Sequence, residues 1–348
     1  MIDTAAIHTH LEDRAARDIF SGVVRITRDG QELFSGAYGY ANRAWLVPTT
    51  LDTRFDLASV TKLFTTIVAL QTVEEGLLDL DTRAVEFLEL SGTQIHPDAT
   101  LHHFLTHTSG IADDADEEAG EDYAEVWKTH ISYLVRSTES HLPQFVDKPG
   151  NFPPGQGCRY NNAGFILAGL MVERATGTPF RDRVQTHVFD RAGMTDSGFF
   201  SMDVVTPRVA EGADLVDGQW VRNIYSYPPV GSPDGGAHST VVDLERFMAA
   251  AHRGDLLGPD LTSTFFTPQV LHHVDEHGPL HYGYGLEFSY DPDDGGLMFY
   301  EKEGINAGVS AVVRHYPDSR ITLAMLSNME DGIWDSRRHI DSLLRAAG

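Results

Sequence analysis

The placement of β-strand patterns most constrains the fold, because they occur at both ends of this 348-residue chain. Residues 21–27 and 31–38 are rich in strand-forming residues and are joined by Arg28-Asp29-Gly30, a favourable hairpin turn. Three alternating runs lie near the other end, at residues 297–302, 309–316 and 321–327. Since helical patterns fill the middle, we expect an α/β (α+β) fold: an antiparallel β-sheet domain flanked by helices, with an all-α domain inserted into it.

Helical periodicity marks the segments between and beside these strands. Residues 58–75 carry apolar side chains at nearly 3.6-residue spacing, and Gly76 ends the run. Further helices are expected over residues 5–18, over residues 162–175 and after Asp335.

The length of the chain corresponds to about two domains of roughly 150 residues each. Its 41% hydrophobic and 22% charged residues are ordinary for a globular protein with a substantial core. We predict a discontinuous sheet domain made from residues 1–57 and 211–348, and a mainly helical domain made from residues 58–210.

The chain is strongly acidic, with 51 Asp and Glu residues against 26 Lys and Arg, and a formal net charge of −25. Nucleic-acid binding is close to excluded, because contacts to phosphates need a basic surface, and the same sign disfavours anionic membranes. Seven carboxylates lie between Asp113 and Asp122, a run typical of a solvated, mobile loop.

Nothing near the N-terminus has the pattern of an export signal, since the first twenty residues lack both a basic segment and an apolar core. The longest apolar stretch, residues 163–172, is too short to span a bilayer. The single cysteine, Cys158, rules out an intramolecular disulfide. If Met1 is the true start, we expect a cytoplasmic protein with no membrane partner; the oligomeric state stays open.

A first catalytic pattern is Ser59-Val60-Thr61-Lys62, at the start of the predicted long helix. An offset of three places Ser59 and Lys62 on one helix face, so that the amine can approach the hydroxyl. A neutral amine there can accept the hydroxyl proton, and N–H groups at a helix N-terminus favour developing negative charge. Alone the pattern is weak, because serine is also a common helix N-cap.

Two further motifs strengthen this interpretation. Tyr160-Asn161-Asn162 lies between a Pro-Pro-Gly loop and an apolar helix, and Lys302-Glu303-Gly304 lies at the end of a predicted strand. With these in order, the sequence resembles the serine β-lactamase and penicillin-binding-protein superfamily from about residue 20 to 330, particularly its class C-like branch. That branch includes D-aminopeptidases, family VIII carboxylesterases and acyltransferases.

The resemblance implies a β-lactamase/transpeptidase-like fold and three catalytic roles. Ser59 would be the nucleophile that forms an acyl-enzyme, Lys62 the base or proton relay beside it, and Tyr160 a proton-shuttling hydroxyl. Two ammonium groups in one partly buried cleft repel each other, so we expect the pKa values of both Lys62 and Tyr160 to lie below those in water. Chance is a poor explanation for the motifs, because two of the four lysines in the chain, Lys62 and Lys302, fall within them. The other two, Lys128 and Lys148, are then expected on the surface.

The same resemblance implies five substrate-binding positions. Asn162 would orient the catalytic lysine and a substrate amide or carbonyl, and Lys302 would add positive charge to the cleft. Glu303 and Gly304 complete the third motif, and the backbone N–H of Ile305 would form an oxyanion hole with that of the nucleophile.

Glu303 departs from the family pattern, which usually has Thr, Ser or a small residue at this position. A carboxylate there would repel an anionic substrate and pair with Lys302 or Lys62. This weakens the β-lactamase and D-Ala-D-Ala carboxypeptidase interpretations, as does the missing export signal. A neutral or cationic small-molecule ester or amide fits better.

We therefore predict a serine hydrolase of a small ester or amide that needs no metal and no cofactor. Acyl transfer is the first alternative, because an amine or alcohol can resolve the same acyl-enzyme instead of water. A β-lactamase or D-Ala-D-Ala carboxypeptidase is the second alternative, and a non-catalytic ligand-binding member is the third. His103 and His107 are four residues apart but lack the glutamate of a zinc motif, so we expect no metal site.

Overall fold

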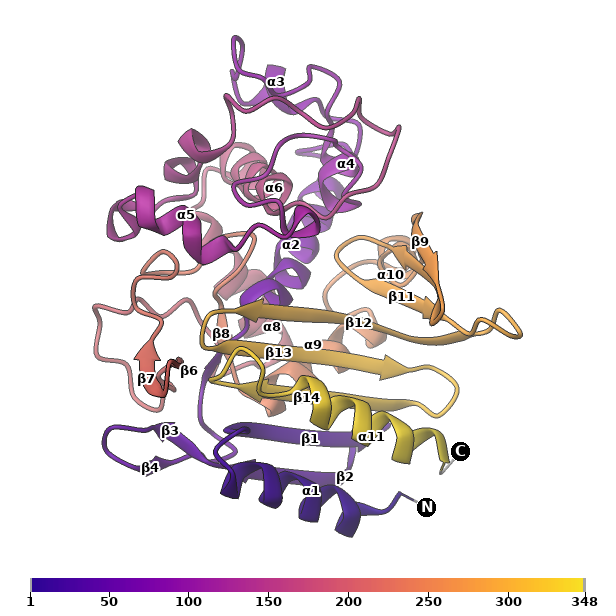
Figure 1. Ribbon diagram of the computed structural model, residues 1–348. Helices are drawn as coiled ribbons and strands as arrows, with labels where there is room; N and C mark the ends of the chain where they lie inside the picture. Colours follow the sequence, from indigo (N-terminus) through magenta and orange to yellow (C-terminus); the bar gives the residue numbers. More distant parts are fainter. Residues whose placement is uncertain (1, 347–348) are drawn as a thin grey trace.

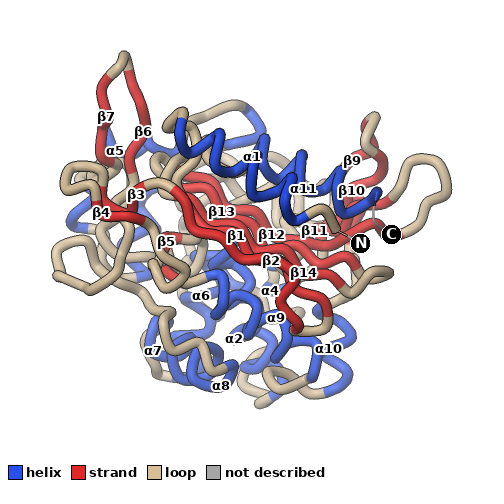
Figure 2. The backbone as a smooth tube through the Cα atoms, turned by 90° about the horizontal axis from the view of Figure 1, so that it is seen from below, coloured by secondary structure: helices blue, strands red, loops and turns tan. Residues whose placement is uncertain are grey.

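A computed structural model describes residues 2–346 and has one large sheet between two layers of helices (Figures 1 and 2). In spatial order its antiparallel strands are β2 (Gln31–Tyr38), β1 (Gly22–Arg28), β14 (Ile321–Ser327), β13 (Val309–Tyr316), β12 (Leu297–Asn306), β11 (Glu287–Tyr290), β10 (Gly278–Tyr282) and β9 (Val270–Asp275). Short pairs join β3 (Tyr40–Asn42) to β4 (Val47–Pro48), β5 (Phe55–Asp56) to β8 (His238–Ser239), and β6 (Ala213–Val216) to β7 (Gln219–Arg222).

Two terminal helices, α1 (Thr4–Ala16) and α11 (Trp334–Ala346), lie together on one face of the sheet (Figure 2). The other helical segments are η1 (Ala58–Thr61), α2 (Lys62–Glu74), α3 (Ala84–Phe87), α4 (Leu101–Leu105), η2 (Glu117–Ala119), α5 (Tyr123–Thr129), η3 (Ser132–Leu134), η4 (Thr138–Gln144), α6 (Asn162–Thr176), α7 (Phe180–Val184), η5 (Gln185–Phe189), α8 (Asp190–Ala192), α9 (Val241–Arg253) and α10 (Pro259–Phe265). Of these, α2, α6 and α9 lie on the opposite side of the sheet from α1 and α11 (Figure 2).

Strand β14 shows why the sheet has a core on each face. Its side chains alternate between the faces, so Leu323 and Met325 pack with the α1 and α11 side, whereas Ala324 and Leu326 pack into the larger cluster on the other side. A strand covered on both faces reads as a continuous apolar run. Helix α2 is likewise buried around most of its circumference, which fixes its first residue firmly in the interior.

The predicted α/β architecture is confirmed, including the pairing of strands from both chain ends: Val24 of β1 lies opposite Met325 of β14. Strand β12 is longer than predicted, because it continues to Asn306, so Lys302-Glu303-Gly304 lies within the strand and not at its end. The division into two domains stays a prediction.

Within residues 2–346, no helix combines the length and hydrophobicity needed to cross a bilayer. The cytoplasmic location also stays a prediction.

A buried ion-pair cluster ties the sheet to α11 and gives a test of the fold. Arg314 of β13 has a side chain only 4% exposed, and it donates to both carboxylate oxygens of Glu301 at 2.8 Å and to Asp341 of α11. We expect Arg314→Leu to lower the free energy of unfolding by about 3–5 kcal/mol in urea titrations, because it leaves buried carboxylates without their main partner. Arg320→Leu is the control: this arginine is 68% exposed beside Asp29, so the loss should be about 0–1 kcal/mol. Equal losses in the two variants would contradict this interpretation.

Candidate active site

Ser59 lies in the tight turn η1, which leads directly into α2. The preceding residue, Ala58, has φ 42°, a left-handed conformation that is uncommon for a residue with a side chain. Its N–H donates to the carboxylate of Asp56 at 2.7 Å, which helps to hold the strained turn. The turn leaves Ser59 partly exposed between buried neighbours.

Lys62 is fully buried, and its ammonium group has three acceptors. Its Nζ lies 2.9 Å from Ser59 Oγ, 2.7 Å from Asn162 Oδ1 and 2.6 Å from the backbone carbonyl of Asp234. These contacts use all three donors of the ammonium. Burial lowers the pKa of Lys62 to about 8, against the opposing effect of the Asp234 carboxylate, and the charge of Lys302 lowers it further. The downward shift that we predicted for this amine is therefore confirmed.

Tyr160 brings a second group to the nucleophile, since its hydroxyl lies 2.8 Å from Ser59 Oγ. Its ring lies close to both lysines, with Lys62 Nζ 5.0 Å and Lys302 Nζ 4.7 Å from the ring centroid. The ring also stacks on His107 at a centroid distance of 4.6 Å. Both cations thus lie close to the electron-rich ring.

The expectation that Tyr160 titrates below its usual range is wrong. Burial raises the pKa of Tyr160 well above the ordinary value, and the Glu117 carboxylate adds to the increase. The hydrogen bond to Ser59 opposes this shift without overcoming it. Tyr160 therefore stays a neutral phenol, suited to pass a proton on and not to act as a phenolate base.

The third motif lies on β12. Lys302 is 2% exposed and forms an ion pair with Glu287 of the neighbouring strand β11, a partner that sequence reasoning missed. At Gly304, any Cβ would lie 2.2 Å from the carbonyl oxygen of Leu57 and 3.0 Å from the backbone nitrogen of Ser59. Only glycine lets the strand lie this close to the nucleophile turn.

Glu303 does not point into the cleft, so its predicted pairing with Lys302 or Lys62 is wrong. It forms an ion pair with Arg337 of α11, on the opposite side of the sheet. Side chains alternate along a strand, and because Lys302 and Gly304 face the nucleophile, position 303 faces away. The predicted repulsion of an anionic substrate by Glu303 has no structural basis.

The acidic run is only in part the solvated loop that we predicted. Five of its seven carboxylates are partly or fully exposed, as expected, but the first two are buried: Asp113 is 6% and Asp114 5% exposed. The Asp113 carboxylate accepts the backbone N–H groups of Asn162 and Ala163, each at 2.8 Å, and so caps the start of α6. A carboxylate at a helix N-terminus is favoured by the unpaired N–H groups there.

Two carboxylates in the later part of the run accept hydrogen bonds from the Tyr160-Asn161-Asn162 motif. Glu117 accepts from the side-chain amide of Asn162 at 2.8 Å, which leaves Oδ1 of that amide facing Lys62. Glu118 accepts the backbone N–H of Tyr160 at 2.6 Å. Lys148 is exposed, as we predicted, and it donates to the carbonyls of Asp113 and Asp114 at 2.9 and 2.8 Å.

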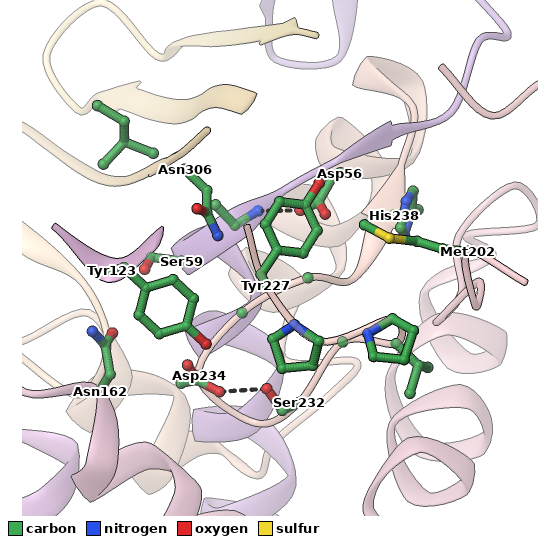
Figure 3. Close-up of a pocket in the computed structure, with 18 of the residues that line it drawn as sticks. Asp56, Ser59, Tyr123, Asn162, Met202, Tyr227, Ser232, Asp234, His238 and Asn306 are labelled. Carbon is green, nitrogen blue, oxygen red and sulfur yellow. Dashed lines mark hydrogen bonds between the residues drawn. The ribbon is translucent and has the colours of Figure 1, made fainter. Parts of the chain in front are cut away.

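Ser59, Glu117 and Asn162 line a small cleft of about 50 Å³ that is open to solvent (Figure 3). Ser59, Tyr123 and Asn162 lie at one side, and Met202 and His238 lie across from them (Figure 3). Sequence reasoning missed Asp56, Asp234 and Tyr227 on its walls. The signal for Asp234 was its position just before Gly235-Gly236, where a close backbone approach is expected.

The structure thus brings Ser59, Lys62, Tyr160 and Asn162 into one hydrogen-bonded cluster. Gly304 lies against this cluster, and Ile305 lines the same cleft. Among residues 2–346, no group of three or more His, Cys, Asp or Glu side chains is placed to hold a metal ion.

Comparison with known proteins gives the family. The Beta-lactamase family model matches residues 7–348. The chain belongs to the beta-lactamase family. A crystal structure of a penicillin-binding protein from Bacillus halodurans is 36% identical, with a TM-score of 0.89 over 97% of this chain and 99% of that one.

Two curated relatives extend this comparison. Penicillin-binding protein 4* of Bacillus subtilis (strain 168) is 26% identical over 93% of this chain and 72% of its own length. Esterase EstB of Burkholderia gladioli is 34% identical over 58% of this chain, and the match spans 54% of that esterase. The resemblance that the three motifs carried is confirmed.

The lowered pKa of Lys62 predicts the pH dependence of acylation. With Lys62 as the predicted base, kcat/KM should rise about tenfold per pH unit below about 8 and level off above it, because only the neutral amine can accept a proton. Lys302→Gln removes a charge that lowers the pKa of Lys62, so the rise should move to higher pH.

Lys128→Gln, at an exposed lysine paired with Glu125, is the control and should leave the profile unchanged. Stopped-flow measurement with an activated ester over pH 6–10 checks these expectations. A profile that falls with pH, or that Lys302→Gln does not shift, would contradict the role of Lys62 as base.

Proposed function

We propose that the protein is a serine hydrolase that cleaves a small ester or amide through an acyl-enzyme on Ser59. The observation that supports this most directly is the pair of hydrogen bonds to Ser59 Oγ, at 2.9 Å from Lys62 and 2.8 Å from Tyr160. A serine between an amine whose pKa is lowered to about 8 and a neutral phenol has both a base and a proton relay.

Acylation begins when neutral Lys62 takes the proton of Ser59 as Oγ attacks the substrate carbonyl. The resulting oxyanion is stabilised by the backbone N–H groups of Ser59 and Ile305. As the tetrahedral intermediate collapses, the C–O or C–N bond breaks, and the leaving group takes a proton that Lys62 supplies through the Tyr160 hydroxyl. The products of this step are a Ser59 ester and a free alcohol or amine.

Deacylation repeats these steps with water as the nucleophile. Lys62 and Tyr160 remove a proton from the water as its oxygen attacks the ester, and Ser59 recovers its proton when the acid leaves. If an alcohol or amine replaces water, the same step transfers the acyl group, which keeps acyl transfer as the alternative. The Asn162 amide and Lys302 position and polarise the Lys62–Tyr160 pair.

The charges that line the cleft favour a neutral or cationic substrate, although Glu303 is not among them. Glu117 and Asp234 line the cleft, whereas Lys62 and Lys302 are 0% and 2% exposed and already paired. An anionic substrate would therefore meet carboxylates before it met a free cation.

Covalent labelling tests the proposed nucleophile. The wild-type protein should gain the mass of one fluorophosphonate group, and Ser59→Ala should gain none, because the acyl-accepting oxygen is removed. Hydrolysis of p-nitrophenyl acetate should fall by about 10³-fold or more in this variant. Ser91→Ala, at an exposed turn, is the matched control and should behave as wild type. Labelling or turnover that survives in Ser59→Ala would refute the proposal, and a hydroxylamine acceptor would reveal acyl transfer as hydroxamate.

Charge selectivity tests the role of the cleft carboxylates. We compare kcat/KM for a choline-type cationic ester with that for its neutral isostere. Glu117→Gln should lower this ratio about two- to fivefold, because an exposed ion pair contributes about 1 kcal/mol or less. Glu303→Gln should leave the ratio unchanged, since that carboxylate pairs with Arg337 away from the cleft. The opposite result, with Glu303 controlling the ratio, would restore the orientation predicted from the sequence.

A further inference from the structure

A second cavity, of about 330 Å³ and open to solvent, adjoins the catalytic cleft. We call it the side cavity. Five residues line both spaces, namely Asp56, Phe200, Met202, Tyr227 and His238. The two spaces therefore meet at one shared wall, and part of that wall is visible across the cleft from Ser59 in Figure 3.

The side cavity exposes apolar side chains in a concave surface. Met202, Val204, Val205 and Ile224 line it, and their exposures are 41%, 61%, 99% and 40%. Isolated exposed apolar residues are common, but several that face one hollow are typical of a ligand-binding surface.

The charged groups of the side cavity are largely paired with one another or with nearby residues. Arg222 lies 3.1 Å from Glu211, and Asp203 lies 2.7 Å from Arg136. These pairs leave little free charge to attract an ionic ligand. An uncharged, apolar group suits the space best.

Contacts from several segments fix the shared wall. The ring of Phe200 lies 5.0 Å from the guanidinium of Arg54 and 5.5 Å from the ring of His238. The backbone N–H of Met202 donates to the carbonyl of Pro229 at 2.7 Å, which joins the two loops that form the wall.

The phenol of Tyr227 is fixed as well. Its hydroxyl accepts the side-chain amide of Asn223 at 2.6 Å, and the same amide nitrogen donates to the carbonyl of Ala307 at 2.8 Å. The wall is therefore preformed, so a ligand that uses it loses little conformational entropy on binding.

Polarity changes along the line from Ser59 to the side cavity. Around the nucleophile the cleft has hydrogen-bonding groups, among them Asn162 and Glu117, which suit a reacting carbonyl and its polar neighbours. The cleft is also lined by Pro228, Pro229 and Met202, and the exposed apolar side chains line the side cavity. The shared wall between them is mixed, since it holds Asp56 and His238 beside Phe200 and Met202.

We propose that the side cavity binds a long apolar substituent of the substrate whose carbonyl reacts with Ser59. This inference rests on the proposed hydrolase function and specifies its substrate: an uncharged ester or amide with an extended or bulky hydrocarbon group. The substituent belongs either to the acyl part or to the leaving group, and the two arms of the experiment distinguish these.

The experiment measures kcat/KM over two series, below the micelle concentration of each ester. Acyl chains lengthen in p-nitrophenyl esters from acetate to decanoate, and alcohol chains lengthen in alkyl acetates from ethyl to decyl. In one series we expect kcat/KM to rise about two- to fourfold per methylene at first, and at least tenfold overall, because burial of each methylene favours the longer chain. A flat profile in both series, with Ser59-dependent hydrolysis intact, overturns this proposal but not the proposed function. The absence of any Ser59-dependent turnover overturns both.

Two variants place the effect in the side cavity. Ile224→Trp fills the space and Ile224→Asp adds a charge to it, and position 224 is exposed enough for both to fold. Each should lower kcat/KM for the longest ester at least tenfold relative to the shortest one. Leu77→Trp, an equally large change at an exposed site outside both spaces, should keep the wild-type ratio. If either folded Ile224 variant keeps the wild-type ratio, the proposal is overturned.

Discussion

The buried ammonium of Lys62 is the constraint on which the rest of the site depends. A lysine with no exposure is costly unless its three donors are satisfied, and here they bond to Ser59, Asn162 and the Asp234 carbonyl. These acceptors come from three separate parts of the chain, so the fold must hold all of them in place at once. The fully packed helix α2 supplies the rigid base for this arrangement. The remaining cost of burial appears as a pKa near 8, which is what makes the amine a usable base.

The acidic run of residues 113–122 fixes the position of the Tyr160–Asn162 motif, which brings Tyr160 to Ser59 and Asn162 to Lys62. Its Asp113 caps α6, its Glu117 orients the Asn162 amide, and its Glu118 holds the backbone of Tyr160. Each of these three contacts fixes Tyr160 or Asn162. Lys148 in turn anchors the buried start of the run. Part of the strong negative charge of the chain therefore positions the Tyr160–Asn162 motif and does not merely solvate the surface.

Much of the fold and the centre of the site could be predicted, because they follow from local periodicity. The strand over residues 321–327 and the helix from Asn162 read directly from the pattern, and the offset of three between Ser59 and Lys62 places both on one face. What could not be predicted depends on contacts that are distant in sequence. Glu303 faces away because the strand continues past it and Arg337 of α11 lies within reach. The resemblance to the family suggested its position in the motif but not the direction of its side chain.

Contacts distant in sequence also explain two wrong predictions about charge: the direction of the pKa shift of Tyr160 and the exposure of Asp113. Tyr160 and Asp113 both lie where tertiary packing removes water, and burial raises the pKa of each. A count of nearby lysines suggested the opposite sign for the tyrosine, because it ignored that Lys302 is already paired with Glu287. A count of carboxylates likewise suggested that the whole acidic run is solvated, because it ignored the unpaired N–H groups at the start of α6 that hold Asp113 inside. The acidic groups that line the cleft, Glu117 and Asp234 among them, therefore face it together with apolar side chains, whereas Lys62 and Lys302 are buried behind them.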